Sequence, residues 1–123
     1  MTRRVSVRIT ANLEANLHSI RAFLIAAGAA TAYVQLLDEL DKTVITNLER
    51  HPEMGRPFLG RPALSIEARD LIAKLSSRTG PENLREYLSG DYLILYAVVE
   101  RTVYLLAIKH HRQLSFAFDR HWS

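Results

Sequence analysis

The sequence contains no cysteine, and its 123 residues include a single tryptophan, five glycines and four prolines. The lack of cysteine excludes disulfide bonds and thiolate metal sites, and it is compatible with the reducing cytosol. The longest apolar stretch, from Phe23 to Ala30, is far too short to cross a bilayer, and the N-terminus lacks a signal-peptide pattern. We therefore expect a cytoplasmic protein with no membrane partner.

Sequence motifs for the common cofactors and metals are also missing. The chain has no phosphate-binding loop, nucleophile elbow or dinucleotide-binding fingerprint. His110 and His111 are adjacent, so in a strand their side chains point apart and cannot chelate one ion simply. The other three histidines lack ligand spacing with them, and the acidic residues 38, 39 and 41 are typical of a solvated helix face. We expect neither a metal nor a cofactor.

Charge is nearly balanced overall but unevenly distributed. The net charge is +3 and the isoelectric point is near 9.5, which favours nucleic acid or an acidic protein as a partner. From residue 101 onward a single acidic residue, Asp119, stands against four cations and three histidines. The cations are Arg101, Lys109, Arg112 and Arg120. The last fifth of the chain is therefore its most basic part.

The region 84–112 has the pattern of three strands. Its sequence is LREYLSGDYLILYAVVERTVYLLAIKHHR. Residues 92–100 are rich in Tyr, Ile, Leu and Val without Gly or Pro, and both faces of the run are apolar. Turn sequences stand at 89–91 and 100–101. We predict an antiparallel meander whose middle strand is covered on both faces. In the third strand, strict alternation separates two sides: Val103, Leu105, Ala107 and Lys109 against Tyr104, Leu106, Ile108 and His110.

The first half of the chain predicts a strand followed by two helices. Residues 3–10 alternate between apolar and polar side chains, and Thr10 can cap a helix that ends near Gly28. A second helix is predicted to start near Thr31 and to stop by His51, because Pro52 disfavours helix in the residue before it. Its apolar stripe is Val34, Leu37, Leu40, Val44 and Leu48.

Two further segments complete the predicted fold. Residues 51–62 are a loop crowded with Pro and Gly, and residues 65–75 are predicted to be a short helix. No linker or repeat divides the chain, so residues 1–123 are expected to form one α+β domain. In it, an N-terminal strand and an antiparallel helical hairpin pack on an antiparallel β-meander, with the short extra helix before the meander.

Basic and imidazole side chains gather where the predicted sheet ends. These candidate residues are Arg85, Lys109, His110, His111 and Arg112. Histidine can act as acid and base near neutral pH, and Arg and Lys can stabilise a phosphorane, so the group suits metal-independent RNA cleavage. Equally, the residues are compatible with an ordinary strand end in solvent.

The sequence resembles the RelE/ParE superfamily of bacterial type II toxin–antitoxin toxins, also called plasmid stabilisation proteins. The resemblance covers nearly the whole chain. It is carried by the opening strand and helical hairpin, by HPEMGRPF, by LREYLSGDYLILYAVVE and by VYLLAIKHHRQ. It implies a small cytosolic toxin that arrests growth and is neutralised by a co-expressed antitoxin.

The superfamily implies two alternative activities. In its RelE branch, ribosome-dependent mRNA endoribonucleases use basic residues in the region of this chain's candidate group. Here Leu93 stands where such relatives often carry an arginine, and Phe116 and Phe118 stand where a catalytic tyrosine is expected. The pattern LREY, GDYLILY and H..R looks more like the ParE branch, whose members poison DNA gyrase by binding it. We therefore predict a ParE-like toxin; the alternatives are a RelE-like nuclease and an inactive binding relative.

Partner binding is predicted at the sheet edge and the aromatic tail. The residues are Tyr104, Leu106, Ile108, Phe116, Phe118 and Trp122. An acidic and apolar antitoxin is expected over the helical hairpin and the sheet edge, because the C-terminal third is basic. A homodimer or a toxin–antitoxin hetero-oligomer is compatible with the sequence.

Overall fold

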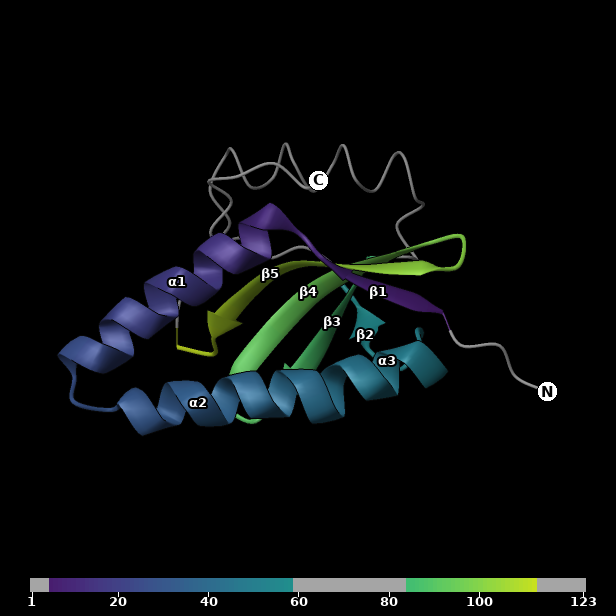
Figure 1. Cartoon of the computed structure of the whole chain (residues 1–123). Coiled ribbons are helices and arrows are strands. Elements are labelled where there is room, and N and C mark those ends of the chain that lie inside the picture. The colour runs from purple at the N-terminus through teal and green to yellow at the C-terminus, as the bar shows by residue number, and fades with distance from the viewer. Residues whose placement is uncertain (1–4, 59–83, 113–123) are drawn as a thin grey trace.

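The computed structural model describes residues 5–58 and 84–112, in which one sheet lies against a layer of helices (Figure 1). The strand order is β1-β5-β4-β3-β2. The strands are β1 (Ser6–Ile9), β2 (Arg56–Pro57), β3 (Leu84–Ser89), β4 (Tyr92–Val99) and β5 (Thr102–His110). The helical elements are α1 (Ala11–Ala26), α2 (Ala30–Glu39), η1 (Leu40–Ile45) and α3 (Thr46–Arg50). The predicted α+β fold is confirmed, whereas the short helix predicted over 65–75 lies outside the described residues.

The predicted meander is confirmed. β3 pairs antiparallel with β4, and β4 pairs antiparallel with β5. Gly90 has a φ of 56° in the first turn and Glu100 has the same φ in the second, so both turns use the left-handed region that tight hairpins require. β1 joins the other side of β5 in parallel, with Ser6 opposite Thr102. β1 and β5, the first and last strands of the described residues, are therefore neighbours.

Strict alternation in β5 fails at a β-bulge. Leu95 pairs with Ala107 and Tyr96 pairs with Leu105, so Leu106 is an extra residue with no partner in the register. Leu106 and Ala107 consequently lie on one face together, and Ile108 returns to the face of Leu105. The two predicted sides of this strand are therefore wrong beyond Leu106, although Lys109 and His110 still leave the strand on opposite faces.

Polar side chains at the start of α1 satisfy the backbone of the bulge. Thr10 caps α1, as predicted, by accepting a hydrogen bond from the Leu13 backbone N–H. The Thr10 hydroxyl also donates to the Leu105 carbonyl at 2.8 Å, and the Asn12 amide donates to the Leu106 carbonyl at 2.9 Å. Because β1 ends at Ile9, these side chains take the place of further strand pairing along β5.

The second helical segment buries a different side from the one predicted. It ends at Arg50, one residue before the predicted limit at His51, but Val34 and Leu37 are exposed and Leu36 is buried instead. From Leu36 the buried residues recur every four positions, at Leu40, Val44 and Leu48. The π-helical turn η1 has wider turns than an α-helix and so keeps residues four apart on one side. The stripe was predicted with an α-helical period throughout.

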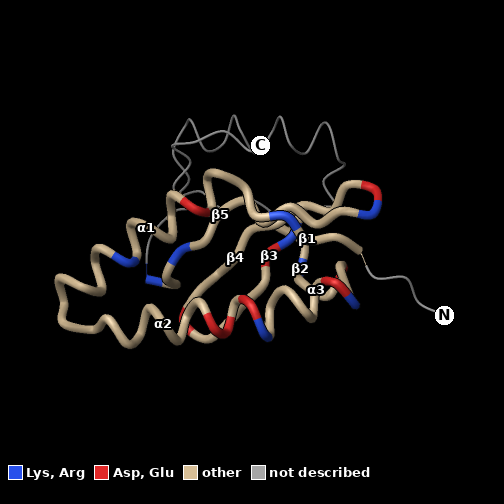
Figure 2. The backbone as a smooth tube through the Cα atoms, in the orientation of Figure 1, with Lys and Arg blue, Asp and Glu red and all other residues tan. Residues whose placement is uncertain are grey.

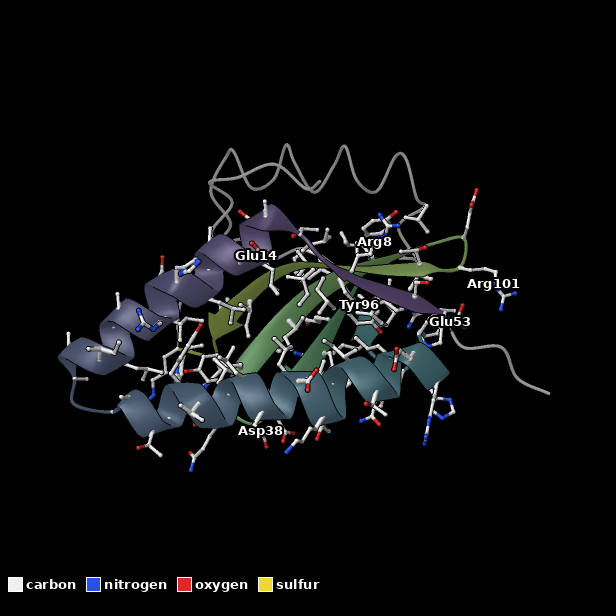
Figure 3. The ribbon with its side chains drawn as sticks, in the orientation of Figure 1. Arg8, Glu14, Asp38, Glu53, Tyr96 and Arg101 are labelled. Carbon is white, nitrogen blue, oxygen red and sulfur yellow. The ribbon has the colours of Figure 1, made fainter. Side chains whose placement is uncertain are left out.

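Both faces of the sheet are buried, as predicted for the middle strand. The face toward the helices holds Tyr87, Ile94, Tyr96, Val98, Val103, Leu105 and Ile108, which pack against apolar residues of the helices. The opposite face holds a second cluster of Phe58, Leu84, Leu93, Leu95, Ala97, Leu106 and Ala107. In Figure 3, Tyr96 lies inside, between sheet and helices, whereas Arg101 points outward at the β4–β5 turn.

A short edge strand was missed within the predicted loop 51–62. β2 pairs with β3 and is tied to it by an ion pair of 2.7 Å between Arg56 Nε and the buried Glu86 carboxylate. Just before it, the Gly55 N–H donates to the Tyr96 hydroxyl at 2.9 Å. A Cβ at position 55 would lie 2.6 Å from that hydroxyl oxygen and 2.6 Å from the Glu86 carbonyl oxygen. Glycine is therefore required by close packing, which a turn-based interpretation of the loop does not reveal.

Candidate functional site

Arg85 fastens the loop before β2 to the sheet. It pairs with Tyr96 across β3 and β4, so its side chain lies on the helix-facing side. Its guanidinium donates from Nη1 to the backbone carbonyls of Glu53 and Gly55, at 3.1 and 2.7 Å. The position and contacts of Arg85 are therefore those of a residue that holds local structure.

Lys109 lies on the opposite face of the sheet. It pairs with Leu93, which belongs to the second cluster, and its exposed fraction is only 3%. Arg85 and Lys109 thus extend from different faces, two strands apart. A ligand that contacts one of these cations cannot contact the other from the same side.

His110 and His111 form a small aromatic group with Tyr92 at the end of β5. The His110 ring contacts the Tyr92 ring edge-on, with centroids 5.4 Å apart, and its centroid lies 4.5 Å from that of His111. The Arg112 backbone N–H donates to His110 Nδ1 at 3.1 Å, and the His111 backbone N–H donates to the Asp91 carbonyl at 2.8 Å. The end of β5 is therefore fixed to the β3–β4 turn.

The imidazole of His110 favours its neutral form. Burial lowers the pKa of His110 from its ordinary value of 6.5, and the neighbouring His111 lowers it further. Asp91 opposes these effects, whereas Arg112 and Lys109 add to them. At neutral pH, His110 is thus an uncharged hydrogen-bonding group beside the cation of Arg112.

A cleft of about 900 Å³ lies between the helical hairpin and this end of the sheet. α1 contributes Asn16, Ser19, Ile20, Phe23 and Leu24, and α2 contributes Ala32, Gln35, Leu36 and Glu39. The sheet contributes Tyr92, Ile108, His110 and Arg112 together with the turn residues 89–91. Its volume and mostly apolar lining, with a few polar groups, are typical of a binding site.

The cleft brings together only part of the predicted candidate group. His110 and Arg112 line it, and His111 contacts His110 at its border. Arg85 and Lys109 are not among its lining residues, for the reasons of position given above. The described residues therefore do not gather all five candidates at one point.

The predicted partner-binding residues occupy different environments. Ile108 lines the cleft but is 2% exposed, and Leu106 at the bulge is 1% exposed. Tyr104 packs partly buried against the second cluster. Phe116, Phe118 and Trp122 lie outside the described residues.

The contribution of the helical hairpin to the cleft does not follow from the sequence patterns. In the sequence, spacings of four, three and four residues predict one core-facing stripe on the first helix, formed by Leu13, Leu17, Ile20 and Leu24. Phe23, which is 71% exposed, falls outside that stripe. The available signal was the position of Phe23 beside that stripe, near the end of α1. That position indicates a binding surface only if the helices are known to extend beyond the sheet.

Among residues 5–58 and 84–112, no group of three or more His, Cys, Asp or Glu side chains could hold a metal ion. Within the same ranges, no helix is long and apolar enough to cross a membrane.

Comparisons with known proteins identify the family. The model of the ParE toxin of the type II toxin–antitoxin system parDE matches residues 7–115. A comparison with curated proteins found no match. The matched region contains every described helix and all of the meander, together with most of β1. This chain therefore belongs to the ParE toxin family of type II toxin–antitoxin systems.

Proposed function

We propose that this toxin arrests growth by binding and poisoning DNA gyrase in the cytoplasm, without catalytic residues of its own. Family membership makes the chain the toxin of a type II system with a cognate antitoxin. The gyrase target goes beyond that membership. One observation carries it: the candidate catalytic side chains do not converge on a common point.

The divergence of the cations argues against phosphodiester cleavage. Such a reaction needs an acid, a base and cations placed around one phosphate. Arg85 is engaged with two backbone carbonyls, and Lys109 is buried on the other face of the sheet. Of the five candidates, His110, His111 and Arg112 remain near one another, and neither Arg85 nor Lys109 adds its charge to theirs.

The alternative is a ribosome-dependent mRNA endoribonuclease. It is favoured by the neutral imidazole of His110 beside the Arg112 cation in one cleft, since a neutral histidine can accept a proton from a ribose hydroxyl. In this alternative the ribosome supplies what the toxin lacks. No metal is invoked.

For the antitoxin, we propose a segment with apolar and acidic side chains that occupies the cleft. The apolar walls of the cleft would receive large side chains, and Arg112 at its border would pair with a carboxylate. This proposal keeps Ile108 as a contact residue at the base of the cleft. We also propose apolar contacts between the antitoxin and four aromatic residues: Tyr104, Phe116, Phe118 and Trp122.

Alanine variants distinguish gyrase binding from RNA cleavage. We expect His110→Ala and Arg85→Ala to remain toxic when they are induced without antitoxin, because neither side chain would act in chemistry. Growth arrest and primer extension on cellular mRNA would be measured together. Thermal unfolding of each variant serves as the control, since Arg85 also holds the loop before β2.

Loss of toxicity in a folded His110→Ala variant, accompanied by loss of mRNA cleavage, would favour the nuclease. Absence of growth arrest by the wild-type chain would instead indicate the inactive relative. Retained toxicity in both variants without mRNA cleavage is the result that gyrase binding predicts.

A further inference from the structure

The connected ends of α1 and α2 form an uncharged and exposed part of the molecule. No charged residue occurs between Arg21 and Asp38, a segment with the sequence AFLIAAGAATAYVQLL. Figure 1 shows these helix ends extending beyond the sheet, and Figure 2 shows them without a charged residue. A helical region that is apolar on several sides is usually buried against something.

Six apolar residues of this region face away from the cleft. On α1 and α2 they recur at helical spacings of three and four, and none of them lines the cleft. We call them the outer hairpin face: Ala22, Ile25, Ala26, Ala30, Val34 and Leu37. Ile25 is 47% exposed, Val34 is 64% exposed and Leu37 is 38% exposed. This surface is therefore separate from the one proposed for the antitoxin.

We propose that the outer hairpin face is a contact surface between two copies of this chain, with α1 of one copy against α2 of the other. The charge distribution selects a second copy as the occupant. Two copies with a net charge of +3 repel each other, and a contact at the uncharged hairpin end keeps their basic residues apart. An acidic partner finds no cation within this face.

The borders of the outer hairpin face are complementary in charge. Arg21 stands at its α1 border and Asp38 at its α2 border, and both are exposed. Asp38 points away from the sheet in Figure 3 and pairs with Lys42 at 2.9 Å. When α1 packs against α2 of the other copy, Arg21 of each copy lies toward the acidic border of the other, twice by symmetry.

The available area sets the strength of this contact. The six residues and their polar borders present on the order of 500 Å² per copy, or about 1,000 Å² in total, which is the lower end of specific interfaces. Three of the six residues, Ala22, Ala26 and Ala30, are alanines, so close approach of the helices is possible along half of the face. We therefore expect a reversible dimer with a dissociation constant in the micromolar range.

A matched pair of variants tests the proposal. Sedimentation velocity over a concentration series would be run on the purified full chain, freed of antitoxin, and on Val34→Lys and Leu88→Lys. Both positions carry an exposed apolar side chain, 64% and 63% exposed, but Leu88 lies on β3 outside the outer hairpin face. We expect the wild-type chain to dimerise, Val34→Lys to weaken dimerisation at least about tenfold, and Leu88→Lys to leave it unchanged.

The absence of cysteine allows a second test with single-cysteine variants. A short bifunctional maleimide should join two copies of Ala30→Cys and should leave Leu88→Cys largely as single chains. A wild-type chain that stays monomeric at every concentration would overturn the proposal. So would equal weakening by the two lysine variants, or equal cross-linking of the two cysteine variants.

Discussion

Tyr96 links the sheet to the loop that precedes β2. Its ring is fully buried in the helix-facing core, and its hydroxyl accepts the hydrogen bond of the Gly55 N–H. Burial raises the pKa of Tyr96, and the hydrogen bond from Gly55 partly offsets this effect. The hydroxyl therefore stays protonated, and a single side chain supports both packing and loop position.

Replacing this tyrosine should destabilise the protein through one unsatisfied donor. In Tyr96→Phe the buried Gly55 N–H loses its acceptor, and we expect a loss of about 1–3 kcal/mol in the free energy of unfolding. Urea denaturation measures this loss. Tyr33→Phe, at a partly buried tyrosine packed against the same core, is the control and should change stability much less. Equal losses in the two variants would contradict the assigned role of the hydroxyl.

His110 should make stability dependent on pH in the acidic range. The pKa of His110 in the folded protein is lower than its ordinary value of 6.5, so the unfolded chain binds the proton more readily. Above pH 6.5, His110 is neutral in both states and does not change the free energy of unfolding. As the pH falls below 6.5, the unfolded chain takes up the proton first and the folded state loses stability. When the pH is lowered from about 7.5 to about 5.5, the melting temperature of the wild-type chain should fall more than that of His110→Gln. A smaller fall in melting temperature for the wild-type chain than for His110→Gln would contradict the lowered pKa of His110.

At the scale of elements, the start of α1 and the bulge of β5 form one unit. Asn12 is completely buried, and its amide reaches the carbonyl of the unpaired bulge residue Leu106. Asn16 supports the same strand by accepting the Ile108 N–H at 3.0 Å. The bulge returns Ile108 and His110 to the cleft side, so this unit determines which residues line the cleft.

Removing the Asn12 amide should therefore affect both stability and the cleft. We expect Asn12→Ala to lower the free energy of unfolding by about 1–3 kcal/mol, because a buried carbonyl loses its donor. Amide chemical shifts of Ile108 and His110 should change in the folded variant. His18→Ala, at an exposed position of the same helix outside the cleft lining, should change neither. Unchanged shifts in Asn12→Ala would indicate that the bulge is independent of α1.

The elements differ in how far their sequences determine them. The meander was predictable because β-branched and aromatic runs alternate with turn sequences, and Thr10 marks the start of α1. The bulge at Leu106 and the π-helical turn η1 were not, since both depend on tertiary contacts rather than on local propensity. β2 was missed because its two residues form a strand only beside β3.

At the scale of the whole molecule, the candidate site shows the same limit. Adjacency in the sequence correctly suggested that His110, His111 and Arg112 lie near one another. The separation of Arg85 and Lys109 onto opposite faces follows from register, which the sequence did not specify. The cleft also depends on the helical hairpin extending beyond the sheet, a property of packing. The family match over residues 7–115 then assigns the chain to the ParE toxins.

The most direct test of gyrase poisoning uses purified components. The full chain, freed of its antitoxin, would be added to DNA gyrase with relaxed plasmid DNA, and supercoiling and DNA breakage would be measured. The binding account predicts loss of supercoiling with accumulation of cleaved DNA, equally for the wild-type chain and for His110→Ala, and reversal by the antitoxin. Undisturbed supercoiling at an excess of toxin that arrests growth in cells would contradict it.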